Sequence, residues 1–145
     1  MKSGISTPVA AAPFSIDLRI YYQQTDAAGV VYHSNYLAFM EAARTEYLRH
    51  LGIDLIVLAE EDAAMFVVHH ADVRFRRPAR LDDRVQVTAM PHRVGGARVA
   101  FLQTVLRDGQ CLIEASIELA CVHRHHWRPI PLPRRVRAAL ETVSQ

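Results

Sequence analysis

The most constraining feature of the sequence is a change of hydrophobic period after one long apolar segment. Residues 36–51 carry large apolar side chains over a wide arc at helical spacing, and Gly52 is a natural stop. From residue 65 the period becomes two, and tight-turn signals separate the alternating segments. One long helix with a mainly antiparallel meander is typical of an α+β fold in which the sheet curls around the helix.

The expected elements can be given bounds. We predict five strands, at 14–22, 65–76, 83–93, 99–107 and 110–123, with turns at Gly95-Gly96 and Asp108-Gly109. The sequence also favours short helical segments at 53–60 and near the C-terminus. The breadth of the apolar arc indicates that the long helix is enclosed on several sides, with Glu41, Arg44 and Arg49 on the remaining arc. We expect the side chain of Ser34 or Asn35 to cap the start of that helix.

Length and composition limit the class of protein. The 145 residues fit one domain, which we place at 14–145 after a flexible tail at 1–13. The formal net charge of +2 does not suggest a nucleic-acid-binding protein. No stretch approaches the roughly 20 apolar residues of a membrane span, and residues 9–12 are too short for a signal-peptide core. Cys111 and Cys121 are best interpreted as buried free thiols, so we expect a cytoplasmic protein without integral membrane association.

Asp26 is the strongest candidate for a catalytic carboxylate. It lies in the loop QQTDAAGVVYH, shortly before the free amides at the start of the long helix. A carboxylate beside such donors suits acyl transfer, because it can attack the acyl carbon or activate water while an amide stabilises the oxyanion. Spacing alone leaves a second interpretation open, in which Asp26 only forms an Asx-turn. Similarly, Gly29 either allows close approach to a ligand or simply turns the loop, and His33 is either functional or a helix-entry residue.

The loop and helix together resemble a known family. The run TDAAGVVYH-x-NY-x-x-F-x-E-x-AR, with the later block VRFRRPARLDDRVQV, is similar to 4-hydroxybenzoyl-CoA thioesterase-like hotdog proteins. The similarity is strongest to the Tol–Pal-associated acyl-CoA thioesterase branch. It implies an antiparallel sheet wrapped around one helix. It also implies a homodimer or homotetramer whose active sites lie between subunits, and hydrolysis of short-chain or aromatic acyl-CoA without a cofactor.

The resemblance also assigns residues. It gives Asp26 as the catalytic aspartate, the His33 amide as the donor to the thioester carbonyl, and Tyr22 and Tyr32 as pocket walls. Arg93 and Arg98 flank a hairpin at which some relatives carry basic residues for the CoA nucleotide. One departure is Gln24, which stands where the family usually has an acid. That departure motivates an alternative function, a non-catalytic module that binds acyl-CoA or an acyl carrier protein. A dehydratase of the same fold fits the loop less well.

Basic and histidine-rich segments remain to be placed. Arg76 belongs to an arginine cluster around Pro78 that either binds CoA phosphates or protects a strand edge. Residues 123–137 contain five arginines and no acid, which suits CoA phosphates, an acidic carrier protein or an anionic membrane as well as an ordinary basic tail. His69 and His70 should point to opposite faces of a strand, so we expect no metal site.

Overall fold

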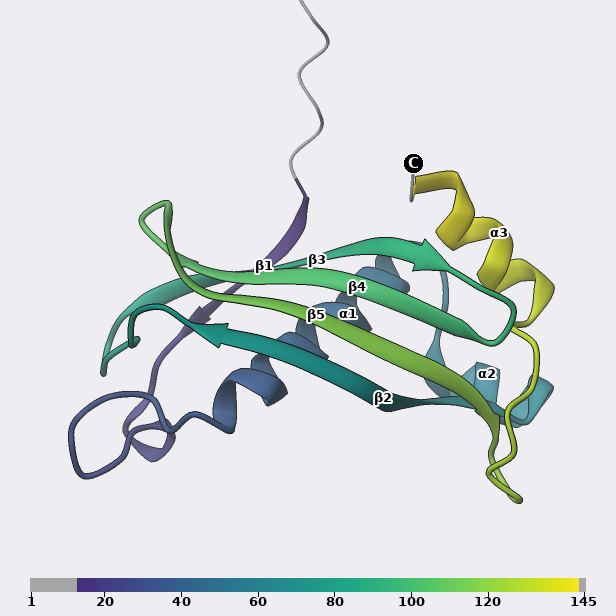
Figure 1. Ribbon diagram of the computed structural model, residues 1–145, viewed down its shortest axis with the longest axis horizontal. Helices are drawn as coiled ribbons and strands as arrows, with labels where there is room; N and C mark the ends of the chain where they lie inside the picture. Colours follow the sequence, from purple (N-terminus) through teal and green to yellow (C-terminus); the bar gives the residue numbers. More distant parts are fainter. Residues whose placement is uncertain (1–12, 144–145) are drawn as a thin grey trace, which may run out of the picture.

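A single antiparallel sheet and one long helix dominate the molecule. The computed structural model describes residues 13–143, so the predicted N-terminal tail lies almost entirely outside the described residues. Figure 1 shows α1 lying along one face of a five-stranded sheet of order β1-β3-β4-β5-β2. The elements are β1 (Phe14–Arg19), η1 (Tyr22–Gln24), α1 (Asn35–His50), α2 (Leu55–Asp62), β2 (Ala64–Phe75), β3 (Arg84–Val94), β4 (Arg98–Arg107), β5 (Gln110–His123) and α3 (Arg134–Val143).

The predicted meander is confirmed in its type, order and turns. β3 and β4 are joined at Gly95-Gly96, and β4 and β5 are joined at Asp108-Gly109. Both turn residues of the second hairpin have positive φ, 51° at Asp108 and 79° at Gly109, as a tight hairpin of this hand requires. The inward-facing residues Val85, Val87 and Ala89 are buried against α1, so the alternation in the sequence identified the core face of β3.

The first strand is shorter than predicted. β1 ends at Arg19, and the two tyrosines that continue the apolar run belong to a 3-10 turn and its flank. The amide of Tyr21 donates to Gln24 Oε1 at 2.8 Å, and the hydroxyl of Thr25 donates to the carbonyl of Tyr22 at the same distance. These local bonds replace the ladder bonds that a longer strand would make.

The first turn of α1 is not stabilised by the side-chain cap that the sequence predicted. Ser34 precedes the helix, but its side chain makes no capping bond. The side-chain amide of Asn35 instead donates to the carbonyl of Gln24 at 2.9 Å, which ties the helix to the preceding loop. The predicted side-chain cap is therefore wrong. At the other end, Gly52 takes φ +85°, as expected for the residue that ends a helix.

α1 is covered on one face rather than on several. It packs mainly on β3 and β1, and Leu37 is 46% exposed although it belongs to the apolar arc. Arg44, predicted on the remaining arc, is only 6% exposed. Its guanidinium donates to Gln103 Oε1 at 2.9 Å, so it faces the sheet. The prediction for Arg44 is wrong because a polar partner on β4 allows an arginine to be buried.

β2 is one of the two edge strands of the sheet, and β1 is the other. Val68 and Phe75 are each 55% exposed on β2. A bulge at His69 breaks the alternation, because Val68 pairs with Leu119 and the next pair is His70 with Glu118. His69 Nε2 also lies 3.6 Å from Glu118, so both histidines share the face of that carboxylate. The prediction that they point to opposite faces is wrong.

Candidate functional site

The loop between β1 and α1 is closed by its own backbone. Thr25 and Val31 form an isolated antiparallel bridge, and the amide of Asp26 donates to the carbonyl of Val30 at 2.9 Å. Gly29, with φ +81°, completes the reversal that this closure requires. The amide of Val31 donates to the carbonyl of Ala79 at 2.8 Å. The loop is therefore anchored to the segment between β2 and β3.

Asp26 lies exposed near the tip of this loop. Its Oδ1 accepts from the amide of Ala28 at 2.8 Å, which is the Asx-turn that the sequence left open. The other carboxylate oxygen has no hydrogen-bond partner among residues 13–143. One oxygen thus fixes the side chain while the second faces solvent.

The backbone before α1 offers an unpaired donor. The carbonyl of His33 accepts from the amide of Tyr36 at 3.3 Å, but the amide of His33 donates to nothing in the described part of the chain. The 16-residue helix that follows adds the positive end of its dipole at this point. The ring of Tyr32 lies 4.5 Å from the ring of His33, so the two side chains form one exposed wall.

A hollow of about 260 Å³ adjoins this helix start. Its walls are mostly apolar, with basic groups at one side: Val31, His33, Tyr36, Phe75, Arg76, Arg77, Pro78 and Ile113. Tyr36 is almost fully buried, and its hydroxyl oxygen accepts from the amide of Ala79 at 2.9 Å. Burial raises the pKa of Tyr36, so the hydroxyl keeps its proton near neutral pH. Arg76 is half-exposed and lies 3.3 Å from Glu114.

The structure brings some predicted site residues together and leaves others apart. His33 and Arg76 line the same hollow, and Tyr32 contacts His33. Tyr22, Asp26 and Gly29 lie on the neighbouring loop but do not line the hollow.

Arg93 and Arg98 belong to the opposite end of the sheet. They flank the β3–β4 hairpin, nine or more residues from the start of β3, which corresponds to roughly 30 Å at about 3.4 Å per residue. Arg98 also lies 3.8 Å from Glu118. Within one chain, these two arginines are therefore not part of the site that contains His33.

The sequence did not single out Tyr36, Phe75 or Ile113 as lining residues. Tyr36 was counted among core residues of the helix, and its ring does pack 5.9 Å from that of Phe75. One sequence feature could have pointed to this wall of the hollow, because the apolar Phe75 directly precedes the two arginines that border the hollow. The structure shows that Phe75 is exposed.

Gln24 has a structural role where an acid was expected. Its side-chain oxygen accepts from the amide of Tyr21. Its backbone carbonyl accepts from the amide of Tyr32 and from the side chain of Asn35, both at 2.9 Å. The side-chain oxygen of Gln24 is therefore held within the loop, and its neutral amide adds no charge near Asp26.

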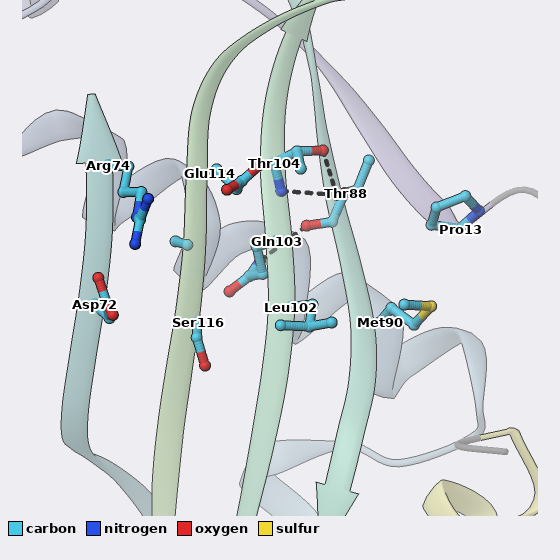
Figure 2. Close-up of a pocket in the computed structure, with 11 residues that line it drawn as sticks. Pro13, Asp72, Arg74, Thr88, Met90, Leu102, Gln103, Thr104, Glu114 and Ser116 are labelled. Atoms are coloured by element: carbon cyan, nitrogen blue, oxygen red, sulfur yellow. Dashed lines mark hydrogen bonds between the residues drawn. The ribbon is translucent and has the colours of Figure 1, made fainter. Parts of the chain in front are cut away.

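A second hollow, the outer hollow, lies on the face of the sheet opposite α1 (the outer face; Figure 2). It has a volume of about 480 Å³ and extends across β2, β5, β4 and β3. In Figure 2, α1 lies behind the sheet. The hydroxyls of Thr88 and Thr104 are 2.8 Å apart there, and the neighbouring Met90 is 41% exposed. None of the predicted site residues lines this hollow.

Among residues 13–143, no group of three or more histidine, cysteine, aspartate or glutamate side chains could hold a metal ion. No helix in that part of the chain is both long and apolar enough to cross a membrane.

Sequence comparison decides the family. The profile of the thioesterase superfamily matches residues 28–113, which include the helix start and most of the sheet. The chain belongs to the thioesterase superfamily. The resemblance of the loop and helix to hotdog thioesterases is thus confirmed, and so is the α+β hotdog fold.

Individual thioesterases agree with this assignment. The chain is 41% identical over 131 residues to the acyl-CoA thioesterase YbgC of Haemophilus influenzae, covering 90% of this chain and 96% of that protein. It is 29% identical over 127 residues to the 1,4-dihydroxy-2-naphthoyl-CoA hydrolase of Thermosynechococcus vestitus, covering 87% of each. Among solved structures, a probable thioesterase from Bartonella henselae superposes with a TM-score of 0.80 at 34% identity, covering 84% of this chain and 100% of that one.

Proposed function

We propose that the protein hydrolyses acyl-CoA thioesters, with Asp26 as the catalytic carboxylate and the His33 amide as the donor to the thioester carbonyl. The observation that carries this proposal is the unpaired His33 amide at the start of α1, beside a hollow that is apolar on most sides. A donor of this kind strengthens as negative charge develops on the carbonyl oxygen. The names of the relatives, which include an acyl-CoA thioesterase and an aromatic acyl-CoA hydrolase, support CoA esters as the substrate class.

The chemistry needs water and no cofactor. The acyl carbon gains an oxygen as the carbon–sulfur bond breaks, and the proton released from water ends on the thiolate of CoA. Asp26 can take that proton as general base, or it can attack the carbon first and form an anhydride that water then opens. Its unpaired oxygen is the atom available for either role, because the other oxygen accepts from Ala28. Incorporation of oxygen-18 into the enzyme during a single turnover would identify the second route.

A panel of short-chain and aromatic acyl-CoAs, with thiol release monitored, tests the proposal. We expect Asp26→Asn to lower kcat by about 100-fold or more, the usual contribution of a positioned acid–base group, with the fold intact. Asp17→Asn is the matched control, because Asp17 is an exposed carboxylate on β1 without an ion-pair partner in residues 13–143. Equal rates for wild type and Asp26→Asn would remove Asp26 from the mechanism.

A non-catalytic binding module is the second candidate. It is favoured by the position of Asp26, which lies outside the lining of the hollow and forms an Asx-turn. That function requires measurable binding of acyl-CoA or of an acylated carrier protein with no thiol release above background. The same panel, supplied also as carrier-protein thioesters, separates the two functions and identifies the preferred thiol.

We also infer a homodimer formed by the edge of the sheet. β2 presents 12 residues of unpaired backbone edge, together with exposed apolar residues on the face toward α1. A strand of this kind favours antiparallel pairing with its own copy. Pairing would cover Val68 and Phe75 and bring a second subunit to the border of the hollow.

A further inference from the structure

The middle of β2 carries two adjacent, exposed histidines beside a carboxylate of β5. His70 is the cross-strand neighbour of Glu118, and the bulge leaves His69 without a partner of its own on β5. Glu118 follows Glu114 and Ser116 at the period of two, and both of these residues line the outer hollow. The histidines and the carboxylate therefore lie on the outer face of the sheet, away from the hollow at the start of α1.

The contact between His69 and Glu118 has the geometry of two metal ligands. Nε2 of His69 lies 3.6 Å from Oε1 of Glu118, and both side chains are partly exposed. Imidazole nitrogen and carboxylate oxygen are both common zinc ligands. Two such atoms bound at about 2.0 Å in a tetrahedral site lie roughly 3.3 Å apart. A small shift of either side chain would therefore let one zinc ion bind both atoms.

One chain supplies only half of such a site. In the described part of the chain, no third histidine, cysteine, aspartate or glutamate side chain completes a metal-binding group with this pair. A structural zinc ion is almost always held by four ligands. The two that are missing must therefore come from a second molecule.

The proposed dimer brings a second pair of ligands to the first. Homodimers of this kind have a two-fold axis, and full-length antiparallel pairing of β2 with its copy places that axis at the middle of the strand. The middle of β2, Ala64–Phe75, falls between His69 and His70. Residues that face each other in antiparallel strands have their Cβ atoms about 5 Å apart. An imidazole is longer than half of that distance, so His69 and the partner's His69 both reach the axis.

We propose that two chains together form one zinc site on the outer face of the dimer. The four ligands are Nε2 of His69 and one carboxylate oxygen of Glu118 from each chain. This inference rests on the proposed dimer and is independent of the proposed hydrolysis. The two carboxylates balance the charge of the ion, which links the chains across β2.

A competing contact at Glu118 is weak. Arg98 lies 3.8 Å from Glu118, and its side chain is exposed. An exposed ion pair of this kind contributes little to stability, so it does not hold the carboxylate away from a metal ion.

Titration with zinc chloride after treatment with EDTA tests the site. Calorimetry of the wild-type dimer should give one zinc ion per two chains. We expect His69→Gln and Glu118→Gln each to weaken zinc binding by at least about 100-fold, because each change removes two of the four ligands. His92→Gln is the matched control, because His92 is an exposed histidine on β3, which β4 and β5 separate from β2. Its zinc affinity should equal that of wild type.

Zinc should also strengthen the dimer, because an ion that binds only the dimer shifts the association equilibrium by mass action. Sedimentation of dilute protein with and without zinc measures the shift. Wild type and His92→Gln should gain dimer when zinc is added, whereas His69→Gln should not. Where the dimer is too tight to dissociate, a rise in Tm with zinc that His69→Gln lacks reports the same effect.

A monomeric variant tests whether the site is shared. Val68→Lys puts a charge on the pairing edge but keeps both His69 and Glu118. As a monomer it should bind zinc no better than His69→Gln. Equally strong binding by this monomer and by wild type would show that one chain is sufficient, and the shared site would be wrong.

Other results would also overturn the site. Zinc bound only at one or more ions per chain, or at full strength by His69→Gln, would assign the ion to other groups such as the histidines at 123–126. A wild type that stays monomeric with and without zinc would refute the dimer and the site together. Thiol release from acyl-CoA is measured on the same samples. Absence of hydrolysis with one zinc ion still bound per dimer would refute the proposed function and leave the site standing.

Discussion

At the scale of single residues, a polar network lies between α1 and the sheet. Gln103, 1% exposed, donates to the carbonyls of Met40 and Thr88 at 3.0 Å each and accepts from Arg44 at 2.9 Å. Burial lowers the pKa of Arg44, yet an arginine stays charged at any ordinary pH. One glutamine therefore satisfies two buried carbonyls and one buried cation.

We expect Gln103→Leu to destabilise the protein by about 3–5 kcal/mol, because it leaves a buried charge without its partner. Arg44→Leu should cost less, about 1–3 kcal/mol, since only a neutral acceptor is left unpaired. Urea unfolding of the two single variants and the double variant measures the coupling, which should be at least 1 kcal/mol. Gln86→Leu, an exposed change on β3, should stay within about 0.5 kcal/mol of wild type. Additive single effects would show that the two side chains do not act together.

The sequence contained part of this information. Gln103 follows Val99 and Phe101 at the period of two, so alternation assigns it to the inner face, where a polar side chain needs a partner. Arg44 lies four residues from both Met40 and Leu48, on the same helical face. Neither position reveals the other, because the pairing depends on how the helix crosses the strands. Tertiary contacts of this kind cannot be read from local period.

At the scale of elements, the segment between β2 and β3 supports the candidate site. The carbonyl of Ala79 accepts from Val31 in the site loop, and the amide of Ala79 donates to Tyr36 on α1. Asp83 closes this segment by accepting from the amide of Arg80 at 2.8 Å and from the guanidinium of Arg107 at 2.7 Å. The site loop and the helix start thus share one support.

The ionisation of Asp83 makes this support sensitive to acid. Burial alone would raise the pKa of Asp83, but the bonds from Arg80 and Arg107 and the charges of both arginines outweigh it and hold the pKa below its usual range. A carboxyl whose pKa is lowered by folding stabilises the protein above the unfolded pKa of about 4 and loses that contribution as the pH falls through the folded pKa.

We therefore expect Asp83→Asn to cost about 1.5–3 kcal/mol at pH 7, the usual worth of a charge-assisted hydrogen bond. The difference from wild type should shrink below pH 4, where the wild-type carboxyl becomes protonated. Thermal unfolding between pH 3 and pH 7 measures it. Asp82→Asn is the neighbouring control, because the Asp82 side chain has no hydrogen-bond partner in residues 13–143 and asparagine tolerates its φ of 70°. A constant difference across this pH range would contradict the role of the charge.

Strand and helix order were predictable because period and turn chemistry are local. The helix cap was not, since the choice between Ser34 capping its own helix and Asn35 reaching back to Gln24 depends on where the preceding loop runs. For the same reason the sequence named Asp26 and His33 as candidates but could not place them relative to the hollow. The loop motif identifies the residues, and the anchoring at Ala79 determines where they lie.

At the scale of the whole molecule, the separation of the predicted site residues agrees with the proposed dimer. Arg93 and Arg98 lie at the end of the sheet that carries the β3–β4 hairpin, whereas His33 and Arg76 lie at the other end (Figure 1). An antiparallel dimer through β2 would place the two ends of neighbouring subunits side by side. The resemblance implied active sites between subunits, but the sequence alone could not assign each arginine to the site of its own chain or to that of a partner.

Association through the edge of β2 and association through the outer hollow would give different assemblies. Two lysine substitutions distinguish these assemblies. Val68→Lys places a charge on the edge of β2 at a side chain that is 55% exposed in one subunit, so the fold of the single chain should survive. We expect it to yield monomers in sedimentation experiments, because a buried unpaired charge in the dimer would cost several kcal/mol. Met90→Lys places the same charge beside the outer hollow at a side chain that is 41% exposed and remote from β2. It should leave the dimer and its activity intact and remove only a tetramer formed through the outer face. If Val68→Lys stays dimeric and active while Met90→Lys yields monomers, the subunits associate through the outer face, and the site of each chain must be complete without its partner.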